Sequence, residues 1–292
     1  MKITLKQLAV FNAVYCSGTT VQAAERLALS QSAISSALHE LEKLLNVKLF
    51  ERNGKKLVIT PAARRLYPQA AAVLMQVEEM EEAFSSGKLQ LNIGASTTIG
   101  NYLLPELISA FTRRYPNIEI ILHVHNTREV CEGLRDFAYD LGFIEGDNLF
   151  DELIAEKWRQ DELTLFAATH SQFVDDQTDT VSMSQLKKLP LVLREQGSGT
   201  RETIERLILR DVSHPHILQL SHSEAIRQAV IHDFGIGCLS KYVLEDALKL
   251  GKIRYLTLTG KPLYRTLWLV KHHNKYLSDG LQAFLQFCRD YQ

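Results

Sequence analysis

The first part of the fold is decided by residues 20–60, whose sequence is TVQAAERLALSQSAISSALHELEKLLNVKLFERNGKKLVIT. Its apolar spacing predicts two short amphipathic helices, and a tight basic hairpin follows them. The outer face of the second helix carries mostly short polar side chains, which are Gln31, Ser32, Ser35, Ser36, His39 and Lys43. A helix that lies against base edges in a DNA groove needs such side chains, whereas most surface helices carry long charged ones. This stretch therefore favours a module that recognises a DNA sequence over an enzyme.

Three helices are predicted within residues 4–45, and capping residues mark their ends. Thr4 begins the first helix in a capping box, and Gly18 ends it. Thr19 or Thr20 caps the second helix, and Ser30 caps the third. The third helix has a core stripe with spacings of 4, 3 and 4, formed by Ile34, Leu38, Leu41 and Leu45.

A β-hairpin is predicted next, with strands over 47–50 and 56–59. Its connection contains Asn53-Gly54, the strongest short hairpin signal, because both residue types tolerate a positive φ. Arg52 and Lys55 are then expected at the tip of a wing, where they can reach the DNA backbone or the minor groove.

A long helix follows, with Thr60 as its N-cap and Pro61 as its first residue. Its apolar residues recur at spacings of 4, 3, 4, 3 and 4 and are Leu66, Ala70, Val73, Val77, Met80 and Phe84. This pattern covers about three heptads and predicts a dimer-forming linker helix, roughly 39 Å long at 1.5 Å per residue. A helix packed against its own domain is the alternative, because three heptads is the lower limit of the signal.

From residue 88 onward, strands alternate with helices, which predicts parallel α/β sheets. The expected strands are 89–95, 118–124, 140–144, 191–194, 217–220 and 236–238, and the expected helices are 101–115, 127–137, 200–209 and 223–232. This length is sufficient for two lobes with a cleft between them.

Composition is that of an ordinary soluble chain of two or three domains, with 292 residues, 46% of them hydrophobic and 23% charged. No apolar run approaches the roughly 18–20 residues that span a bilayer, and the N-terminus lacks the pattern of a signal peptide. The four cysteines are far apart and form no CxxC pair, so we expect free thiols in a reducing compartment. These features predict a cytoplasmic protein with no membrane partner.

Charge is unevenly distributed along the chain, although its net value is only −1. Residues 1–60 carry eight Lys or Arg and four Asp or Glu, a balance of +4. Residues 61–87 have a balance of −2, which leaves −3 for the remainder. A basic head on a mildly acidic body is typical of a chain with one polyanion-binding module, and chance asymmetry is the alternative.

Residues 1–60 resemble the winged helix-turn-helix of LysR-type transcriptional regulators. The segments that carry this resemblance are 23–27 (AAERL), 30–35 (SQSAIS), 41–42 (LE), 49–52 (LFER) and 60–61 (TP). The order that follows, a linker helix and then a two-lobed α/β domain, is also that of the family. More narrowly, the segments 95–102 (ASTTIGNY), 143–146 (FIEG) and 194–202 (REQGSGTRE) are similar to those of YeiE-like members.

The resemblance implies a chain of three parts, in which an α-rich winged helix-turn-helix precedes an α/β effector domain. The expected ranges are 1–60 for the DNA-binding domain, 61–87 for the linker and dimerisation helix, and 88–292 for the effector-binding domain. In the family, the effector domain has two α/β subdomains of periplasmic-binding-protein type, joined by two crossovers. We expect subdomain I over 88–161 and 267–292, subdomain II over 162–266, and crossovers near 158–164 and 263–267.

The resemblance also implies the partners, which are double-stranded promoter DNA and a small-molecule effector bound by a homodimer or homotetramer. Neither an enzymatic activity nor a cofactor is expected. Ser36 departs from the family pattern, because many members carry Arg there and a bidentate Arg would recognise guanine. The base preference of better-known members therefore does not transfer to this chain.

The residues expected to contact DNA are Gln31, Ser32, Ala33, Ser35, Ser36, His39, Arg52 and Lys55. Gln can pair with adenine through two hydrogen bonds, Ser can donate or accept, and Ala can touch a thymine methyl group. Because Ser30 caps the recognition helix, the positive end of its dipole can face a phosphate. A Ser-rich face that is merely solvated is the alternative, which the neighbouring helix and wing disfavour.

Two segments, one in each lobe, are predicted where a strand ends and a helix begins. They are Ser96, Thr97 and Thr98 in the first lobe and Gly197, Ser198, Gly199, Thr200 and Arg201 in the second. Hydroxyls and free N–H groups at two helix N-termini form a cradle for an anion, and ligands of such sheets bind at the carboxyl ends of strands. We therefore expect a small oxyanion in the cleft, and ordinary helix capping is the alternative for each segment alone.

Glu145 also follows a strand and is the expected acidic residue of this site. Its carboxylate could accept a hydrogen bond from a protonated oxyanion, such as hydrogen phosphate or bisulfite, and reject a fully ionised anion. The alternatives are an ion pair with Arg201, a contact with an amino group of the ligand, and a solvated charge on a surface loop. Glu224 lies at a predicted helix start, where an acidic side chain is stabilising, and is expected to line the cleft.

Two further groups of residues give weaker evidence for a metal site or a catalytic site. His123 and His125 share one face of a strand but have no third ligand near in sequence, so no metal site is expected. Ser198 lies in Gly-Ser-Gly and not in the Gly-x-Ser-x-Gly of a nucleophile elbow. A solute-binding protein or α/β enzyme would predict absent or salt-insensitive DNA binding, and an architectural DNA-binding protein would leave the paired Ser/Thr segments unexplained.

Overall fold

The structure is a computed structural model that describes residues 2–53, 56–85, 89–146, 150–175, 179–209, 216–258 and 262–291. For residues 52, 53, 56, 79 and 82–85 it describes the backbone alone. The chain forms two compact units. Unit 1 contains residues 1–89 with 274–277, and unit 2 contains residues 90–273 with 278–292.

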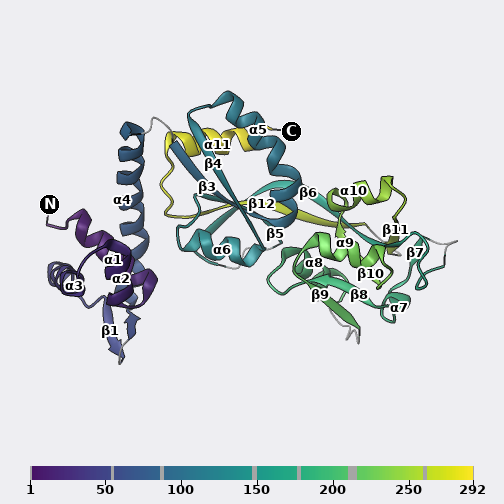
Figure 1. Cartoon of the computed structure of the whole chain (residues 1–292), viewed down its shortest axis with the longest axis horizontal. Coiled ribbons are helices and arrows are strands. Elements are labelled where there is room, and N and C mark those ends of the chain that lie inside the picture. The colour runs from purple at the N-terminus through teal and green to yellow at the C-terminus, as the bar shows by residue number, and fades with distance from the viewer. Residues whose placement is uncertain are drawn as a thin grey trace. The chain divides into compact units, whose positions relative to one another are not determined.

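Unit 1 begins with three helices, which are α1 (Leu5–Ser17), α2 (Thr20–Leu27) and α3 (Gln31–Leu45) (Figure 1). The predicted caps are confirmed, because the Thr4 and Ser30 hydroxyls accept backbone N–H bonds at the starts of α1 and α3. Thr19 and not Thr20 caps α2. Gly18 ends α1 with a φ of +70°, a left-handed conformation that a residue without a Cβ adopts without strain.

A hairpin of β1 (Phe50–Asn53) and β2 (Lys56–Ile59) follows α3. The prediction of a first strand over 47–50 is wrong, since the strand begins three residues later. The physical reason is Glu42, whose carboxylate accepts the N–H groups of Leu49 and Phe50 at 2.8 and 3.3 Å. These bonds hold the residues after α3 as a loop, so pairing starts only at Phe50.

The linker helix α4 (Pro61–Ser85) packs its first turns against α1. Tyr67 stacks on Tyr15 with ring centroids 4.0 Å apart, and Ala70 is buried. Further along the predicted seam, Val73 and Met80 are 40% and 61% exposed. The alternative of packing on its own domain therefore describes the start of α4, while Val73 and Met80 farther along are exposed. Phe84 belongs to the residues whose side chains are not described.

Unit 2 is built on a ten-stranded sheet with the order β4-β3-β5-β12-β6-β10-β8-β9; β11 also pairs with β6, and β7 pairs with β11. The strands are β3 (Leu89–Ser96), β4 (Ile118–His125), β5 (Leu141–Glu145), β6 (Leu153–Ala168), β7 (Thr180–Val181), β8 (Leu191–Arg194), β9 (Ile217–Leu220), β10 (Ile236–Ser240), β11 (Ile253–Leu258) and β12 (Leu263–His272). The helices are η1 (Ile99–Leu103), α5 (Leu104–Arg114), α6 (Thr127–Arg135), α7 (Met183–Leu186), α8 (Gly199–Leu207), α9 (Ser223–Ile231), α10 (Lys241–Lys249) and α11 (Asp279–Asp290).

Two long strands, β6 and β12, run through both lobes of unit 2. They pair antiparallel from Leu263 opposite Leu163 to His272 opposite Leu153. The predicted parallel pairing is confirmed for β3–β5, β8–β9 and β8–β10, and the antiparallel β6 and β12 make the sheet mixed. The expected crossovers 158–164 and 263–267 lie within these two strands.

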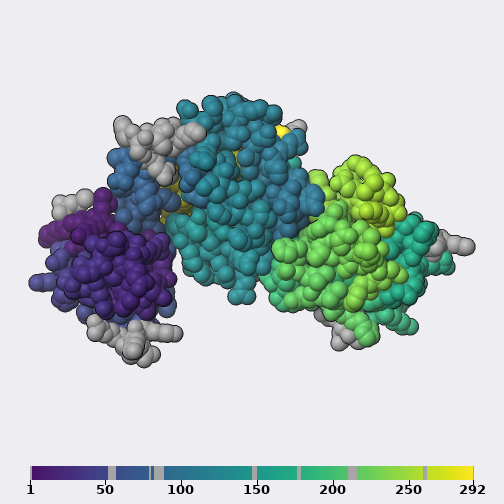
Figure 2. Space-filling view, viewed as in Figure 1, coloured from purple at the N-terminus to yellow at the C-terminus, as the bar shows by residue number. Residues whose placement is uncertain are grey.

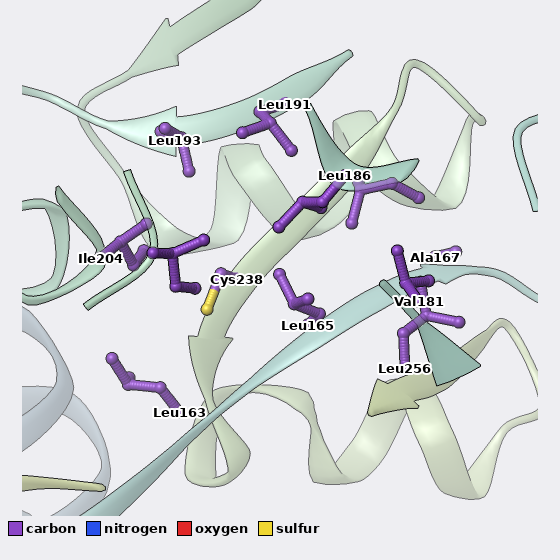
Figure 3. Packing of buried hydrophobic residues seen from close by; sticks show 12 residues of the cluster. Leu163, Leu165, Ala167, Val181, Leu186, Leu191, Leu193, Ile204, Cys238 and Leu256 are labelled. Carbon is purple, nitrogen blue, oxygen red and sulfur yellow. The ribbon is translucent and has the colours of Figure 1, made fainter. Parts of the chain in front are cut away.

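The two lobes have separate apolar cores. Figure 3 shows the core of the second lobe, where side chains such as Leu165, Leu193 and Cys238 point toward one another from β6, β8 and β10. The first lobe packs α6 against β5 through Val130, Leu134 and Ile144. In Figure 2 the lobes of unit 2 are two masses that touch over a narrow region. Among the described residues, no helix is long and apolar enough to cross a membrane.

The helix predicted over 101–115 begins as the π-helix η1 and continues as α5. Pro105 explains the change, because it has no N–H to donate to the turn before it and is tolerated only at a helix start. The extra turn places Thr98 at the start of η1, directly after β3.

Candidate DNA interface and effector site

Helix α3 separates its side chains into a buried face and an exposed face. Ile34, Leu38 and Leu41 are buried in unit 1. On the other side, Gln31, Ser32, Ser36 and His39 are exposed, and Ala33 and Ser35 are half-buried. The residues predicted to contact bases therefore lie where a groove of DNA could reach them.

The carboxamide of Gln31 is held by a residue that the sequence analysis did not select. Its Nε2 donates a hydrogen bond to Oγ1 of Thr20, the first residue of α2, at 3.1 Å. The hydroxyls of Ser30 and Ser32 lie 3.0 Å apart at the start of α3. The N-termini of α2 and α3 thus form one polar edge.

The wing is attached to this edge through its second strand, because Leu57 N–H donates to the Gly18 carbonyl at 3.1 Å. Arg52 lies in β1 opposite Leu57. Lys55 falls outside the described residues.

In unit 2, the two predicted Ser/Thr segments come together around Glu145. Thr98 N–H donates to Glu145 Oε1 at 2.8 Å from the first lobe, and the Thr200 hydroxyl donates to Oε2 at 2.9 Å from the second. The lobes touch at Gly199, where a Cβ would lie 1.7 Å from the Glu145 carbonyl oxygen. Only glycine fits this close approach.

Arg265 of β12 is the partner of Glu145, and the sequence analysis missed it. Its Nη1 lies 2.6 Å from Glu145 Oε2, and its Nε lies 2.7 Å from Asp161 Oδ2. The Ser240 hydroxyl donates to the other oxygen of Asp161 at 2.7 Å. The three charged groups are at most 3% exposed, so both carboxylates and the guanidinium are paired in a dry environment.

These contacts decide the ionisation of Glu145. Burial acts to raise its pKa, but the Arg265 guanidinium and the hydrogen bonds from Thr98 and Thr200 outweigh burial and hold the pKa at about 2. The expected alternatives of a pair with Arg201 and of a surface loop charge are therefore wrong. Arg201 instead donates to Glu205 and to the Arg194 carbonyl.

Arg194 is a second buried arginine that the sequence analysis did not place in the site. It ends β8 and is 2% exposed. Its Nη2 donates to the Thr97 hydroxyl at 3.2 Å, and its Nη1 donates to the Ser223 hydroxyl at 3.1 Å. Nε and Nη2 also bind both oxygens of Glu195. The sequence contained one signal for Arg194, which is the only charged residue of an otherwise apolar predicted strand (LVLR).

Helix capping differs around this site. The N-cap side chain accepts a backbone N–H at α1, α2, α3, α6, α7, α10 and α11. The N-cap side chain makes no such bond at η1, α5, α8 and α9, of which η1, α8 and α9 follow β3, β8 and β9. In addition, Ser96 Oγ is buried without a hydrogen-bond partner among the described residues. At two of these helix starts the backbone N–H groups of Thr98 and Gly199 donate instead to Glu145 Oε1 and Thr127 Oγ1.

Other predicted residues are placed differently. Ser198, Gly199 and Thr200 are buried at the start of α8, and Gly197 precedes them with a φ of +88°. Glu224 is exposed and binds Arg227 and Gln228 of its own helix, so it does not join the cluster. His123 lies 3.3 Å from Asn92 Oδ1. Within the described ranges, no group of three His, Cys, Asp or Glu residues could hold a metal ion.

Comparison with known proteins gives two family matches. The LysR substrate binding domain matches residues 85–292, and the bacterial regulatory helix-turn-helix protein, lysR family, matches residues 5–64. The HTH-type transcriptional regulator YeiE of Escherichia coli K12 is 45% identical over 289 residues, which are 99% of this chain and 98% of YeiE.

Solved structures also match. A full-length OxyR variant from Pseudomonas aeruginosa has a TM-score of 0.72 at 22% identity, over 99% of this chain and 96% of OxyR. The CcmR regulatory domain of Synechocystis PCC6803, in complex with 2-PG, has a TM-score of 0.63 at 25% identity, over 69% of this chain and 96% of that domain.

Proposed function

The chain belongs to the LysR family of transcriptional regulators, and we propose that a small oxyanion, bound between the two lobes of unit 2, controls its action at promoters. As a member of this family it is a DNA-binding transcriptional regulator with an effector-binding domain, and it is not an enzyme. Because the protein binds promoter DNA, we also infer that it acts in the cytoplasm.

For DNA, we propose that Gln31, Ser32, Ala33, Ser35, Ser36 and His39 face the major groove, with Arg52 and Lys55 on the backbone or in the minor groove. The exposure of the α3 face supports this assignment. Replacing Gln31 by Ala should lower the affinity for a specific site by roughly 1–3 kcal/mol. Quantitative binding to the cognate promoter measures this loss, and an unchanged affinity would remove Gln31 from the set.

For the effector, the observation that carries the proposal is the buried Arg194. Its guanidinium reaches hydroxyls of both lobes, Thr97 in one and Ser223 in the other. An arginine edge with two hydroxyls and nearby helix N-termini is suited to the oxygens of an anion. The buried Ser96 hydroxyl adds a donor or acceptor that has no protein partner within the described residues.

The ligand should be small. Gly199 packs directly on the Glu145 backbone, and the Thr200 side chain spans from the second lobe to the Glu145 carboxylate. These contacts bring the two lobes together at Glu145, and we therefore propose a ligand of the size of phosphate or sulfate. The CcmR regulatory domain was solved with a small molecule, 2-PG, which supports effector binding in a domain of this kind.

We propose a changed role for Glu145. Its carboxylate already accepts bonds from Thr98, Thr200 and Arg265, so it holds the two Ser/Thr segments in place. Selection of a protonated anion would require Glu145 to accept a further hydrogen bond beside those from Thr98, Thr200 and Arg265. Effector binding would then shift the equilibrium between arrangements of the lobes and, through the oligomer, the placement of the DNA-binding heads.

Calorimetry of the full-length protein with phosphate, sulfate, bisulfite and bicarbonate tests the proposal. We expect at least one of these ions to bind, and we expect Arg194→Gln to weaken binding by about tenfold or more. A double variant, Thr97→Val with Ser223→Ala, removes two hydroxyls without removing the buried charge and should also weaken binding. Arg128→Ala, at an exposed position, is the control. Absence of binding by all four ions would overturn the oxyanion assignment.

A further inference from the structure

A side-chain hydrogen bond between Thr20 and Gln31 joins the starts of α2 and α3, and it is separate from the bonds that cap these helices. Thr19 caps α2 and Ser30 caps α3, each by accepting a backbone N–H. Thr20 follows the cap of α2, and its Oγ1 accepts a bond from Gln31 Nε2 at 3.1 Å. The bond lies at the exposed edge of the recognition helix.

We propose that Thr20 is a positioning residue that orients the Gln31 carboxamide to recognise adenine. This inference rests on the proposed function, in which Gln31 faces the major groove. It adds a residue from α2 to the determinants of base choice, and it specifies which base Gln31 selects.

The argument follows from counting donors and acceptors. A Gln side chain has two N–H donors on one nitrogen and one carbonyl acceptor. When Thr20 accepts one N–H, Gln31 has one N–H and its carbonyl oxygen left for a base. Adenine presents an acceptor, N7, beside a donor, the N6 amino group, which matches this pair. Guanine presents two acceptors, N7 and O6, and would need both N–H groups.

The bond to Thr20 also restricts the conformations of the Gln31 side chain before DNA binds. An exposed Gln side chain has many rotamers, and fixing it on binding costs conformational entropy. The bond to Thr20 restricts those rotamers before DNA arrives, so less entropy is lost when the base is bound. Removing the hydroxyl should therefore reduce the preference for one base and leave the phosphate contacts unchanged.

The experiment is a selection of duplexes from a random-sequence DNA library by the full-length protein. Four proteins are compared, namely the wild type, Gln31→Ala, Thr20→Val and Thr20→Ser. Val keeps the branched shape of Thr and loses its hydroxyl, whereas Ser keeps the hydroxyl. Thermal unfolding and affinity for a nonspecific duplex are measured in parallel for all four.

We expect Gln31→Ala to lose the preference for adenine at one position of the selected site. At the same position, Thr20→Val should lower the preference for adenine over guanine by about three- to tenfold, the effect of one exposed hydrogen bond. Thr20→Ser should stay close to the wild type, and nonspecific affinity should be the same for all four proteins.

Three results would overturn the proposal, and they are distinguishable. If Gln31→Ala changes no position, the proposed role of Gln31 fails together with the inference. If Gln31→Ala loses a position that Thr20→Val retains, only the positioning role fails. If Thr20→Val weakens the binding of all duplexes equally, or if it lowers the unfolding temperature together with the nonspecific affinity, the role of Thr20 is structural.

Discussion

At the scale of single residues, the effector site depends on two buried arginines with different tasks. Arg265 is enclosed by Glu145 and Asp161, so its charge is fully balanced within the protein. Arg194 has one carboxylate partner, Glu195, and its other bonds go to hydroxyls. An incoming anion can share Arg194 with hydroxyls at less cost than it could displace the carboxylates of Arg265.

Glu195 should therefore weaken anion binding, because its charge lies beside the guanidinium that the anion needs. We predict that Glu195→Gln, which keeps an acceptor and removes the charge, tightens oxyanion binding by about tenfold. Calorimetry with the ion that binds the wild type measures the change. Glu205→Gln, which alters the exposed partner of Arg201, is the matched control and should bind like the wild type. Weaker binding by Glu195→Gln would contradict the prediction.

The lowered pKa of Glu145 predicts a dependence of stability on pH. Its folded value of about 2 lies below its ordinary value of 4.5, so ionised Glu145 stabilises the folded state above pH 4.5. This contribution, on the order of 3 kcal/mol, should be lost as the pH falls from 4.5 toward 2. Urea unfolding at several pH values measures it. Glu145→Gln should be less stable at pH 7 and lack this part of the acid dependence, and an acid dependence equal to that of the wild type would refute the assignment.

At the scale of secondary-structure elements, local signals predicted most boundaries, and the failures have tertiary causes. The capping residues Thr4 and Ser30 act as expected because a cap needs only neighbours in sequence. The first strand of the wing was misplaced because Glu42 of α3 takes the N–H groups of Leu49 and Phe50. The strands β6, β11 and β12 were not predicted as strands, and the structure pairs β11 and β12 with β6, which lies far from both in sequence.

Helix α4 leaves an apolar stripe uncovered, which leads to a prediction about assembly. Val73 and Met80 are exposed on the seam, and exposed apolar side chains at heptad spacing are stabilised by a second helix. We predict that Val73→Lys with Met80→Lys weakens self-association by about a hundredfold, the loss of two buried apolar side chains. Sedimentation velocity over a range of concentrations measures this. Glu78→Lys, exposed on another face of α4, should assemble like the wild type. Unchanged assembly of the double variant would show that the seam is not the interface.

At the scale of the whole molecule, the topology of unit 2 connects the lobes through the same strands that carry their buried charges. Asp161 lies on β6 and Arg265 on β12, the two strands that pass through both lobes. Near these charges, Thr98 of the first lobe and Thr200 of the second both donate hydrogen bonds to the Glu145 carboxylate. A ligand that binds one arrangement of the lobes better than another will stabilise that arrangement by its difference in affinity.

The bound anion should therefore stabilise unit 2 against unfolding. At a hundred times its dissociation constant, the expected gain is about 2.7 kcal/mol in the free energy of unfolding. Denaturant unfolding with and without the ion measures this gain. Sulfate and phosphate also stabilise proteins by exclusion from their surfaces, so Arg194→Gln provides the necessary comparison. An equal gain in Arg194→Gln would mean that the effect is general and not due to the site.

The sequence by itself determined the features that depend on neighbours along the chain. These include the caps of α1 and α3, the core stripe of α3, the seam of α4, and the family, whose motifs lie within short segments. It also located Ser96–Thr98, Gly197–Thr200 and Glu145 as candidates for one site.

Only the tertiary structure decided how these residues are paired. Glu145 meets Arg265 across 120 positions, and Arg194 meets Thr97 across 97. Contacts at such separations depend on the order of strands in the sheet, which no local pattern of capping or spacing encodes. The same reason applies in unit 1, where Thr20 was a candidate cap in the sequence and became the partner of Gln31 only when α2 and α3 were brought together.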